Sequence, residues 1–396
     1  MSIEVSKIVQ AVEPSATLAA SAKAKELAAA GNTVYNLSVG EPDFKTPQHI
    51  IAAAIDAMNN GYTHYTPATG ILPLKEAIVA DYQERYGLTY KPPQCVVTNG
   101  AKHALHNAFF STLNPGDEAI LPAPCWVSYA ELIKLSGATP KIVATKEEDD
   151  FKLSADALRA AITPKTRMLL LCNPSNPTGS RYTREELEAL ADVVIEKDIF
   201  VIADEIYGRL IYGDTKFASF PTVREGLQDR VIVVNGVSKS YAMTGWRIGW
   251  LLAPENVAKK VACLQSQETS NPCSISQYAA LAAISGDQSC VQEMSAEFAK
   301  RREYVMQRIA DIPGLSASRI DGAFYAFMNI KNFLGRKYNG IQVDTDKDWC
   351  LELLQQQKVA TVFGSAFFAD GYARASFAAN METLERAFDG IAEFVK

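Results

Sequence analysis

Four loops of the sequence carry side chains that could do chemistry, and each loop follows a short apolar run that is typical of a buried strand. The loop after residues 231–234 holds Lys239, with Arg247 eight residues further on. A lysine directly after a buried strand is expected to have a lowered pKa and to act as a nucleophilic amine. The planar fork of an arginine suits a phosphate. A solvated surface lysine with a salt-bridged arginine is the alternative.

Two adjacent carboxylates, Asp204 and Glu205, end the apolar run at residues 201–203. An ionised Asp204 at the end of a buried strand needs a cation or a hydrogen-bond donor beside it, because an unpaired buried charge is costly. A protonated pyridine nitrogen would meet this need, and Tyr207 follows close by. Binding of Mg²⁺ and simple capping of a helix are the alternatives for this pair.

The loop at residues 173–179 reads Asn-Pro-Ser-Asn-Pro-Thr-Gly. Its two prolines cannot donate to a strand ladder, and they stiffen the turn that presents Asn176. A merely rigid turn is the alternative, but such a turn hardly needs this particular sequence. We therefore expect Asn176 to have a functional role.

Residues 98–102 leave a fourth strand and open a helix. Gly100 permits close approach of another backbone, and the free N–H groups and the dipole of a helix start favour a phosphate. A plain tight turn is the alternative. The segment is neither G-x-G-x-x-G nor a Walker motif, so the usual signatures of NAD and ATP binding are missing.

Together the four loops offer a phosphate cradle, a nucleophilic lysine, a partner for a pyridinium and a donor for a ring oxygen. Pyridoxal 5′-phosphate requires this set of groups. Because each signal has an ordinary alternative when it is taken singly, the combination is what predicts this cofactor.

The elements that must position these loops follow from the alternation of short β-rich runs with helical stretches. This alternation predicts an α/β fold with a largely parallel sheet and helices on both faces. The expected strands are Cys95–Thr98, Glu118–Leu121, Lys141–Ala144, Met168–Cys172, Phe200–Ala203, Val231–Val234 and Ile248–Leu252. A helix is expected over Arg184–Lys197, capped by Thr183 with Glu186 three residues on. Ligands of such sheets bind at the carboxyl ends of the strands.

The chain of 396 residues is too long for one simple core. After about residue 286 the pattern changes to a long charged helix, about Ser295–Ile309, followed by a smaller α+β section. We expect an N-terminal arm over residues 1–13, a large cofactor-binding domain over 46–285, and a small domain built from 14–45 and 286–396.

Composition excludes several classes of protein. A net charge of −6 argues against a nucleic-acid binder, and no apolar run reaches the length of about 18 residues that a membrane helix needs. Seven cysteines fit a reducing compartment better than a disulfide framework. Four scattered histidines give no usual zinc site. A cytoplasmic protein without a bound metal is expected.

The sequence resembles the fold-type I aminotransferases of class I/II over nearly the whole chain. Residues 236–249 fit the family's pattern for attachment of pyridoxal phosphate at every position, and residues 14–17, 40–44 and 374–376 extend the resemblance towards both ends. It is most similar to bacterial aspartate aminotransferases of the subgroup that also contains prephenate aminotransferases. The resemblance implies a large domain with a mostly parallel seven-stranded sheet flanked by helices, and a smaller α+β domain.

The resemblance also implies roles for residues around the cofactor. Lys239 would bind it covalently and Asp204 would pair with its pyridine nitrogen. Asn176 and Tyr207 would hold the phenolic oxygen. The remaining residues that would contact the ring or the phosphate are Gly100, Ala101, Lys102, Trp126, Ser238 and Arg247. Tyr65 would reach the phosphate bound by a partner subunit, which makes a homodimer with shared sites.

The substrate would be held at both of its ends. Arg374 would bind the α-carboxylate, with Gly40, Asn176 and Trp126 beside it. Lys102 would bind a distal carboxylate together with Ser15 and Thr17, although Lys102 could instead point to solvent. One departure from the family is Gly236, where many relatives have a phosphate-binding serine.

The expected activity is transfer of an amino group between an L-amino acid, aspartate first, and 2-oxoglutarate by a ping-pong mechanism through Lys239. A prephenate, aromatic or alanine aminotransferase is an alternative on the same fold, and so is a pyridoxal-phosphate-dependent C–S lyase. A cofactor-binding regulator or a nucleotide enzyme is a third kind of possibility, which the missing glycine fingerprint and the short N-terminal segment disfavour.

Overall fold

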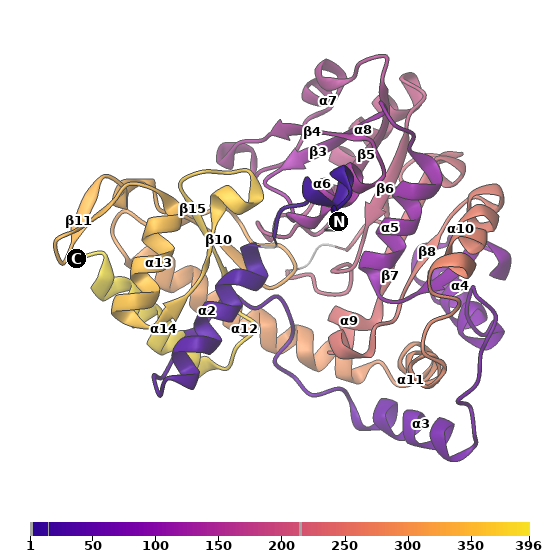
Figure 1. The fold of residues 1–396 in the computed structure, drawn as a ribbon, viewed down its shortest axis with the longest axis horizontal. Helices are drawn as coiled ribbons and strands as arrows, with labels where there is room; N and C mark the ends of the chain where they lie inside the picture. The colour runs from indigo at the N-terminus through magenta and orange to yellow at the C-terminus, as the bar shows by residue number, and fades with distance from the viewer. Residues whose placement is uncertain (1–2, 15, 214–215) are drawn as a thin grey trace.

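The computed structural model describes residues 3–14, 16–213 and 216–396, and the side chains of residues 16–18 are not described. Within these ranges a seven-stranded sheet forms the centre of the larger part of the molecule (Figure 1). In spatial order its strands are β2 (Cys95–Thr98), β8 (Gly249–Leu252), β7 (Val231–Gly236), β6 (Phe200–Asp204), β5 (Thr166–Cys172), β3 (Glu118–Ala123) and β4 (Thr139–Ala144). All neighbours are parallel except the two antiparallel pairs made by β8. The predicted α/β fold is confirmed.

The strands match the apolar runs of the sequence to within two residues at each end. The differences arise where polar residues continue a ladder. β5 begins at Thr166, which pairs with Glu118 of β3, and apolar patterning alone does not reveal such a pair. Apolarity therefore predicts where a strand is buried better than it predicts where the strand ends.

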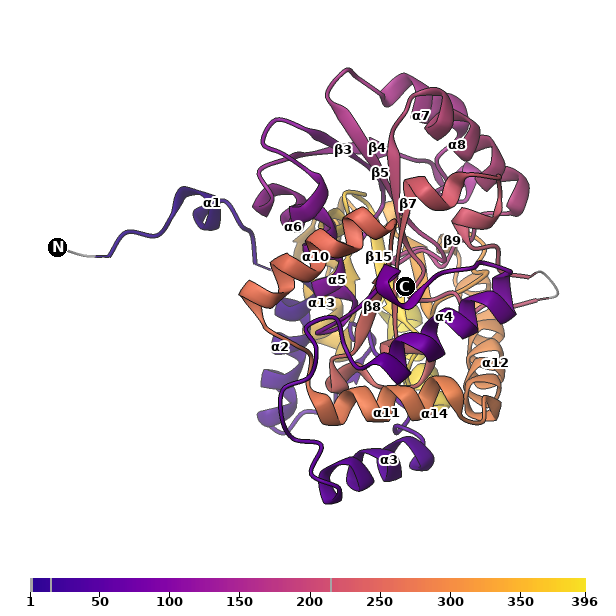
Figure 2. The ribbon, with the colours of Figure 1, turned by 90° about the vertical axis from the view of Figure 1, so that its right-hand side faces the viewer.

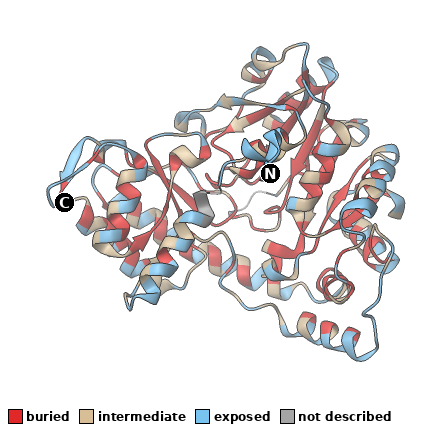
Figure 3. Cartoon of the chain, viewed as in Figure 1, coloured by how far each residue is buried: buried red, intermediate tan, exposed pale blue. Residues whose placement is uncertain are grey.

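In six of the seven strands alternate residues enter two different cores, as the two-residue period of a strand requires, whereas β4 at the edge of the sheet is only partly buried. Val231 and Val233 pack on one face and Ile232 and Val234 on the other. Figure 3 shows these strands as the most continuously buried part of the chain. Helices α4 (Leu72–Tyr86), α8 (Arg184–Glu196) and α11 (Ser274–Ser285) cover the first face, and helices α5 (Ala101–Thr112), α6 (Ser128–Leu135) and α10 (Glu255–Glu268) cover the second.

A separate core holds the C-terminal part of the chain together. Its sheet has the order β14 (Val362–Phe363), β15 (Tyr372–Ser376), β10 (Tyr325–Asn329) and β9 (Ser316–Ala317), and it packs with α12 (Ser289–Asp311), α13 (Asp346–Gln357) and α14 (Met381–Phe394). The hairpin of β11 (Arg336–Tyr338) and β12 (Ile341–Val343) lies at one end. The predicted charged helix is present but is longer at both ends.

The N-terminal segment packs against this C-terminal part. β1 (Tyr35–Asn36) pairs in parallel with β13 (Val359–Ala360), and α2 (Ala16–Ala29) places Ala24 against Leu354. Figure 1 shows α2 in the same part of the molecule as α13 and α14, although α2 and α14 come from opposite ends of the chain. These contacts support a small domain made from both chain ends, and the boundaries at 45/46 and 285/286 stay a prediction.

The remaining described α-helices are α1 (Lys7–Gln10), α3 (Gln48–Asn59), α7 (Ala155–Ala161) and α9 (Val237–Ser240), and short 3₁₀ helices lie between several elements. Figure 2 shows α1 on an extended segment that projects from the rest of the molecule. No helix within the described ranges has the length and apolarity to cross a bilayer.

The strand register brings the four loops of interest to the same end of the sheet, where strands β2, β5, β6 and β7 finish. Cys172 pairs with Asp204, and Asp204 pairs with Val234, so β5, β6 and β7 end side by side. At the next strands, Gly249 of β8 pairs with both Gly236 and Thr98. The loops that follow β2, β5, β6 and β7 therefore start within a few strands of each other.

Candidate active site

A cavity of about 280 Å³ opens at this edge, between the large sheet and the C-terminal sheet. Helix starts, strand ends and loops from both parts of the chain line it. The lining residues are Gly40, Ala101, Lys102, Leu105, Trp126, Tyr129, Asn176, Asp204, Ile206, Tyr207, Ser238, Lys239, Thr244, Arg247, Tyr325 and Arg374. One cavity thus collects most of the residues that the sequence singles out.

The floor of the cavity at the start of α5 is suited to a phosphate. No side chain caps this helix, and its first N–H groups have no acceptor within the helix. Arg247 lies directly over Gly100, because a Cβ atom at Gly100 would clash with Arg247 Nη2. The guanidinium donates to the carbonyl of Thr244 at 2.8 Å. Helix dipole, free N–H groups and a cation therefore meet at one place.

Close packing also explains the departure at Gly236. A Cβ atom there would lie 2.9 Å from Gly249 Cα and 2.9 Å from the carbonyl oxygen of Ile248. Because these are backbone atoms of the neighbouring strand, a serine does not fit without a shift of β8. Ser238, which lines the cavity, supplies a hydroxyl there.

Asp204 is buried at the end of β6 and is held by two donors. The Tyr129 hydroxyl donates to Oδ2 at 2.7 Å, and the backbone N–H of Ile206 donates to Oδ1 at 3.2 Å. Burial raises the pKa of Asp204 to about 6, and the two hydrogen bonds and Lys239 act in the opposite direction. The carboxylate is therefore ionised at neutral pH and can pair with a cation in the cavity.

Lys239 lies on α9 and its ammonium faces the cavity. Its Nζ donates to the carbonyl oxygen of Gly40 at 2.5 Å. Burial lowers the pKa of Lys239 to about 8, Glu41 acts against this, and Arg374 and Arg247 lower it further. More of this amine is thus neutral, and nucleophilic, at neutral pH than of a lysine with an ordinary pKa.

Arg374 is a buried cation, 2% exposed, with neutral partners. Its guanidinium donates to Asn176 Oδ1 at 3.0 Å and to the Ser38 carbonyl oxygen at 2.8 Å, and it lies 4.5 Å from the ring centroid of Tyr325. Its Nε has no hydrogen-bond partner within the described chain, and no carboxylate there forms an ion pair with Arg374. Burial lowers the pKa of this guanidinium. Such a group calls for an anion from outside the chain.

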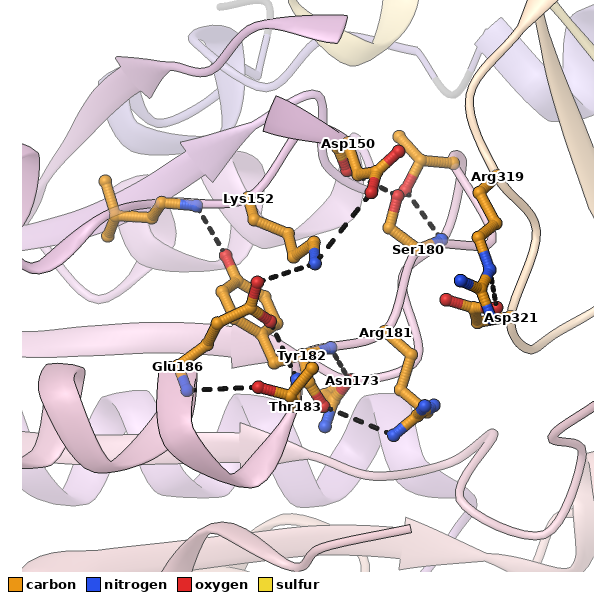
Figure 4. Close-up of polar contacts among 12 residues, drawn as sticks. Asp150, Lys152, Asn173, Ser180, Arg181, Tyr182, Thr183, Glu186, Arg319 and Asp321 are labelled. Atoms are coloured by element: carbon orange, nitrogen blue, oxygen red, sulfur yellow. Dashed lines mark hydrogen bonds and ion pairs between the residues drawn. The ribbon is translucent and has the colours of Figure 1, made fainter. Parts of the chain in front are cut away.

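The loop that presents Asn176 is fastened on several sides (Figure 4). The Ser180 hydroxyl donates to the carbonyl oxygen of Asp150 at 2.6 Å, and the Tyr182 N–H donates to Asn173 Oδ1 at 3.1 Å. Beyond it, Thr183 and Glu186 form the predicted capping box of α8. The loop is therefore a rigid support for Asn176.

Lys102 lines the cavity although the residue is exposed overall. Its Nζ lies 4.7 Å from the ring centroid of Trp126, over the face of the indole. Burial and then Arg247 lower the pKa of Lys102. The cation is therefore available to an anionic group that enters beside Trp126.

Some predicted residues are not at the cavity. The Tyr65 side chain is 91% exposed and lies outside it in a single chain. Gly100 lies beneath Arg247, next to the lining residues. Ser15 and the side chain of Thr17 lie outside the described residues, so their expected role with Lys102 stays a prediction.

Five lining residues were not anticipated from the sequence: Leu105, Tyr129, Ile206, Thr244 and Tyr325. Tyr129 is close to Trp126 in sequence, and the two rings meet edge to face with their centroids 5.3 Å apart. Tyr325 belongs to an aromatic-rich strand, and its hydroxyl meets that of Tyr207 at 2.9 Å across 118 positions of sequence. No local pattern indicates that contact.

Comparison with known proteins gives one consistent result. The family described as aminotransferase class I and II matches residues 32–391. Aspartate aminotransferase of Bacillus subtilis (strain 168) is 44% identical over 100% of this chain and 99% of its own length. A probable aspartate/prephenate aminotransferase of Rhizobium leguminosarum bv. phaseoli is 45% identical over 97% of this chain and 96% of its own.

Known structures agree with these relatives. Aspartate aminotransferase from Rhizobium meliloti superposes with a TM-score of 0.96 at 37% identity, covering 100% of this chain and 99% of that one. Aspartate aminotransferase from Thermus thermophilus with maleate gives 0.93 at 37% identity, covering 99% and 100%.

Proposed function

Because the chain belongs to the class I and II aminotransferases, we propose that this transaminase moves the amino group between L-aspartate and 2-oxoglutarate with pyridoxal 5′-phosphate as its cofactor. The observation that carries the proposal is the position of Arg374, a buried cation without an anionic partner in the described chain, in the same cavity as Lys239 and Asp204. Amino acids and oxo acids share the carboxylate that such a cation binds.

The residues around the cavity fit pyridoxal phosphate. The uncapped start of α5 and Arg247 suit its phosphate, and Asp204 suits its pyridine nitrogen. Asn176 and Tyr207 would hold its phenolic oxygen, and Trp126 would lie against its ring. When bound, this cofactor supplies an electron-withdrawing ring that stabilises the charge left when a substrate loses its α-proton.

The chain's own groups would then divide the work. Arg374 and Asn176 bind the α-carboxylate and orient the substrate. This fixed geometry lowers the entropic part of the activation barrier. The Lys239 amine, with a pKa of about 8, can take the α-proton as a general base. Asp204 remains anionic and keeps a pyridine nitrogen protonated. Since both substrates need Arg374, they would bind in turn, and ping-pong kinetics are expected.

Removal of the Tyr129 hydroxyl tests the role of Asp204. In Tyr129→Phe the Asp204 carboxylate loses its 2.7 Å donor, so its pKa should rise above about 6 and protonation should begin at a higher pH. A protonated Asp204 cannot pair with a pyridinium. We expect the affinity of the cofactor-free protein for pyridoxal phosphate to fall roughly tenfold, and to fall further as the pH is lowered. Absorbance titrations at several pH values measure this.

Tyr338→Phe is a matched control, because Tyr338 also loses a buried hydrogen bond but lies outside the cavity. Its affinity should equal that of the unmodified protein. If Tyr129→Phe bound pyridoxal phosphate with unchanged affinity and pH dependence, the pairing of Asp204 with the cofactor would be wrong.

A preference for acidic substrates rests on Lys102 at the mouth of the cavity. Relatives carry the names aspartate and aspartate/prephenate aminotransferase, and the Thermus thermophilus enzyme is described with maleate, a dicarboxylate. We propose that Lys102 binds the distal carboxylate, with Ser15 and Thr17 assisting. Aromatic donors, alanine and C–S lyase substrates lack that second carboxylate or present it differently.

Lys102→Met keeps the contact with Trp126 but removes the charge. We expect kcat/KM for aspartate and glutamate to fall roughly 10- to 100-fold, as for loss of one charged hydrogen bond of about 1.5–3 kcal/mol. The value for alanine should change little, which makes alanine the internal control. Equal losses for all three donors would show that Lys102 does not read the distal carboxylate.

A half-reaction screen identifies the donor itself. The cofactor-loaded protein is mixed with aspartate, glutamate, alanine, phenylalanine or arogenate, and the change in cofactor absorbance is followed. A fast response to aspartate and glutamate supports the proposal. Dominance of an aromatic donor, or release of pyruvate and ammonia from a β-substituted amino acid, would replace it.

We also propose a homodimer in which Tyr65 completes the phosphate site of the partner. The 91% exposure of Tyr65 and the exposed Ile3, Val5, Ile8 and Val9 of the N-terminal segment support a surface that another subunit covers. Small-molecule substrates and a partner copy are then the expected binding partners. The cytoplasmic location stays a prediction.

A further inference from the structure

Tyr325 joins the two sides of the cavity through its hydroxyl. The residue lies in β10 of the C-terminal sheet and is 1% exposed. Its hydroxyl oxygen is 2.9 Å from that of Tyr207, which follows β6 of the large sheet. The two rings meet edge to face, with centroids 5.8 Å apart. This is a direct polar contact between the two sheets within the cavity.

Tyr325 is also held firmly in place. The Arg374 guanidinium lies 4.5 Å from the ring centroid of Tyr325. The ring of Phe324 packs beside that of Tyr325, with the two centroids 4.8 Å apart. At Gly40 a Cβ atom would come within 2.9 Å of the Tyr325 hydroxyl oxygen, so the chain passes closely over this hydroxyl. The hydroxyl therefore has little freedom to leave Tyr207.

The number of protons decides the direction of the hydrogen bond. A tyrosine hydroxyl has one proton to donate, and it can accept at its oxygen. If Tyr207 donates to the phenolic oxygen of the cofactor, as the proposed function requires, it has no proton left for Tyr325. The 2.9 Å contact is then a hydrogen bond in which Tyr325 donates and Tyr207 accepts.

We propose that Tyr325 is a positioning residue whose hydroxyl donates to Tyr207 and makes Tyr207 a stronger donor to the phenolic oxygen of pyridoxal phosphate. The inference rests on the proposed function of the cavity. Successive hydrogen bonds polarise one another, so a hydroxyl that accepts a bond donates a better one. Tyr325 thus acts on the cofactor without touching it.

The surroundings keep the Tyr325 proton in place. Burial raises the pKa of Tyr325 and the Arg374 guanidinium acts against this, while Cys172 and Glu41 raise the pKa further. The phenol therefore stays protonated over the neutral range and remains able to donate.

A spectroscopic titration separates this role from a merely structural one. A donor to the phenolic oxygen stabilises its negative charge, and that charge otherwise holds a proton on the neighbouring Lys239 nitrogen. Loss of donor strength should therefore raise the pKa that this nitrogen shows in the absorbance of the cofactor-loaded protein without substrate. For Tyr325→Phe we expect an upward shift of about 0.5–1 pH unit. Tyr207→Phe should give a larger shift in the same direction.

The double variant is the decisive comparison. If Tyr325 acts only through Tyr207, then Tyr207→Phe/Tyr325→Phe should titrate like Tyr207→Phe alone. Tyr338→Phe, whose hydroxyl donates to the Phe333 carbonyl in the same part of the chain, should titrate like the unmodified protein. In Tyr325→Phe the kcat for aspartate should fall while its KM changes little, because Arg374 keeps its partners.

Additive shifts in the double variant, or an unshifted Tyr325→Phe protein, would overturn the inference and leave the proposed function intact. A Tyr207→Phe protein that titrates like the unmodified one would instead remove the proposed role of Tyr207 and that of Tyr325 with it. Thermal unfolding of the cofactor-free variants shows whether each one folds. Tyr325→Phe should match Tyr338→Phe in this measurement.

Discussion

Replacing Lys239 by alanine is expected to lower kcat for transamination by roughly 10⁴-fold or more, because one side chain would supply both the covalent attachment and the general base. The amine faces the cavity beside Gly40, and no other lysine within the described ranges lines the cavity except Lys102. Initial rates with aspartate and 2-oxoglutarate, at saturating pyridoxal phosphate, measure the loss.

The attachment can be checked separately from the rate. Borohydride reduction of the loaded protein, followed by peptide mass analysis, should place the cofactor on Lys239 and should fail in Lys239→Ala. Lys300→Ala, which removes an exposed lysine of α12, should behave like the unmodified protein. Full turnover in Lys239→Ala would refute the mechanism.

The lowered pKa of Lys239 gives this reaction a definite pH dependence. Only the neutral amine attacks an aldehyde, so attachment of pyridoxal phosphate to the cofactor-free protein should accelerate as the pH rises towards about 8. Above that pH the amine is already neutral and the rate should level off. With a lysine of ordinary pKa, the rate of attachment would continue to rise over about two further pH units.

Replacing Arg374 by leucine should lower kcat/KM by roughly 100- to 1,000-fold for every amino donor. Loss of a buried, hydrogen-bonded charge pair costs about 2–5 kcal/mol, and each factor of ten corresponds to about 1.4 kcal/mol. Because all substrates have an α-carboxylate, the loss should not depend on the donor. That uniformity distinguishes Arg374 from Lys102.

Stability provides the control for Arg374. In the ligand-free chain its guanidinium is buried against neutral partners, an arrangement that costs free energy. Arg374→Leu should therefore unfold at a temperature close to that of the unmodified protein while its activity falls. Arg374→Lys keeps the charge but loses the fork, and we expect an intermediate loss. A fall in kcat/KM for one amino donor alone would contradict the assignment.

Much of the fold could be predicted because the central strands of the large sheet are buried on both faces. Apolar runs such as Val231–Val234 have no other simple explanation, and Thr183 and Glu186 mark the start of α8 in the local sequence. The reversed direction of β8 has no such local signal. Its pairing with β2 and β7 depends on which loops can span the edge of the sheet.

The candidate site divides in the same way. Lys239, Asp204 and Asn176 directly follow buried strands, so the position of each can be predicted from its own neighbourhood. Tyr129 and Tyr325 act through partners 75 and 118 positions away. Such contacts depend on how two sheets pack, and composition and spacing do not encode that geometry in readable form. The same limit left the contact of Arg374 with the Ser38 carbonyl oxygen unforeseen.

The pairing of β1 with β13 has a consequence for synthesis of the chain. Tyr35 and Asn36 pair with Val359 and Ala360, so β1 cannot be paired until β13 has been synthesised. The strands of the large sheet, residues 95–252, all emerge earlier and can assemble among themselves, as domains do during translation. Gly40 lies four residues after β1, and Arg374 lies beyond β13. A nascent chain that has completed its large sheet therefore still lacks Arg374, and the strand that precedes Gly40 still lacks its pairing partner.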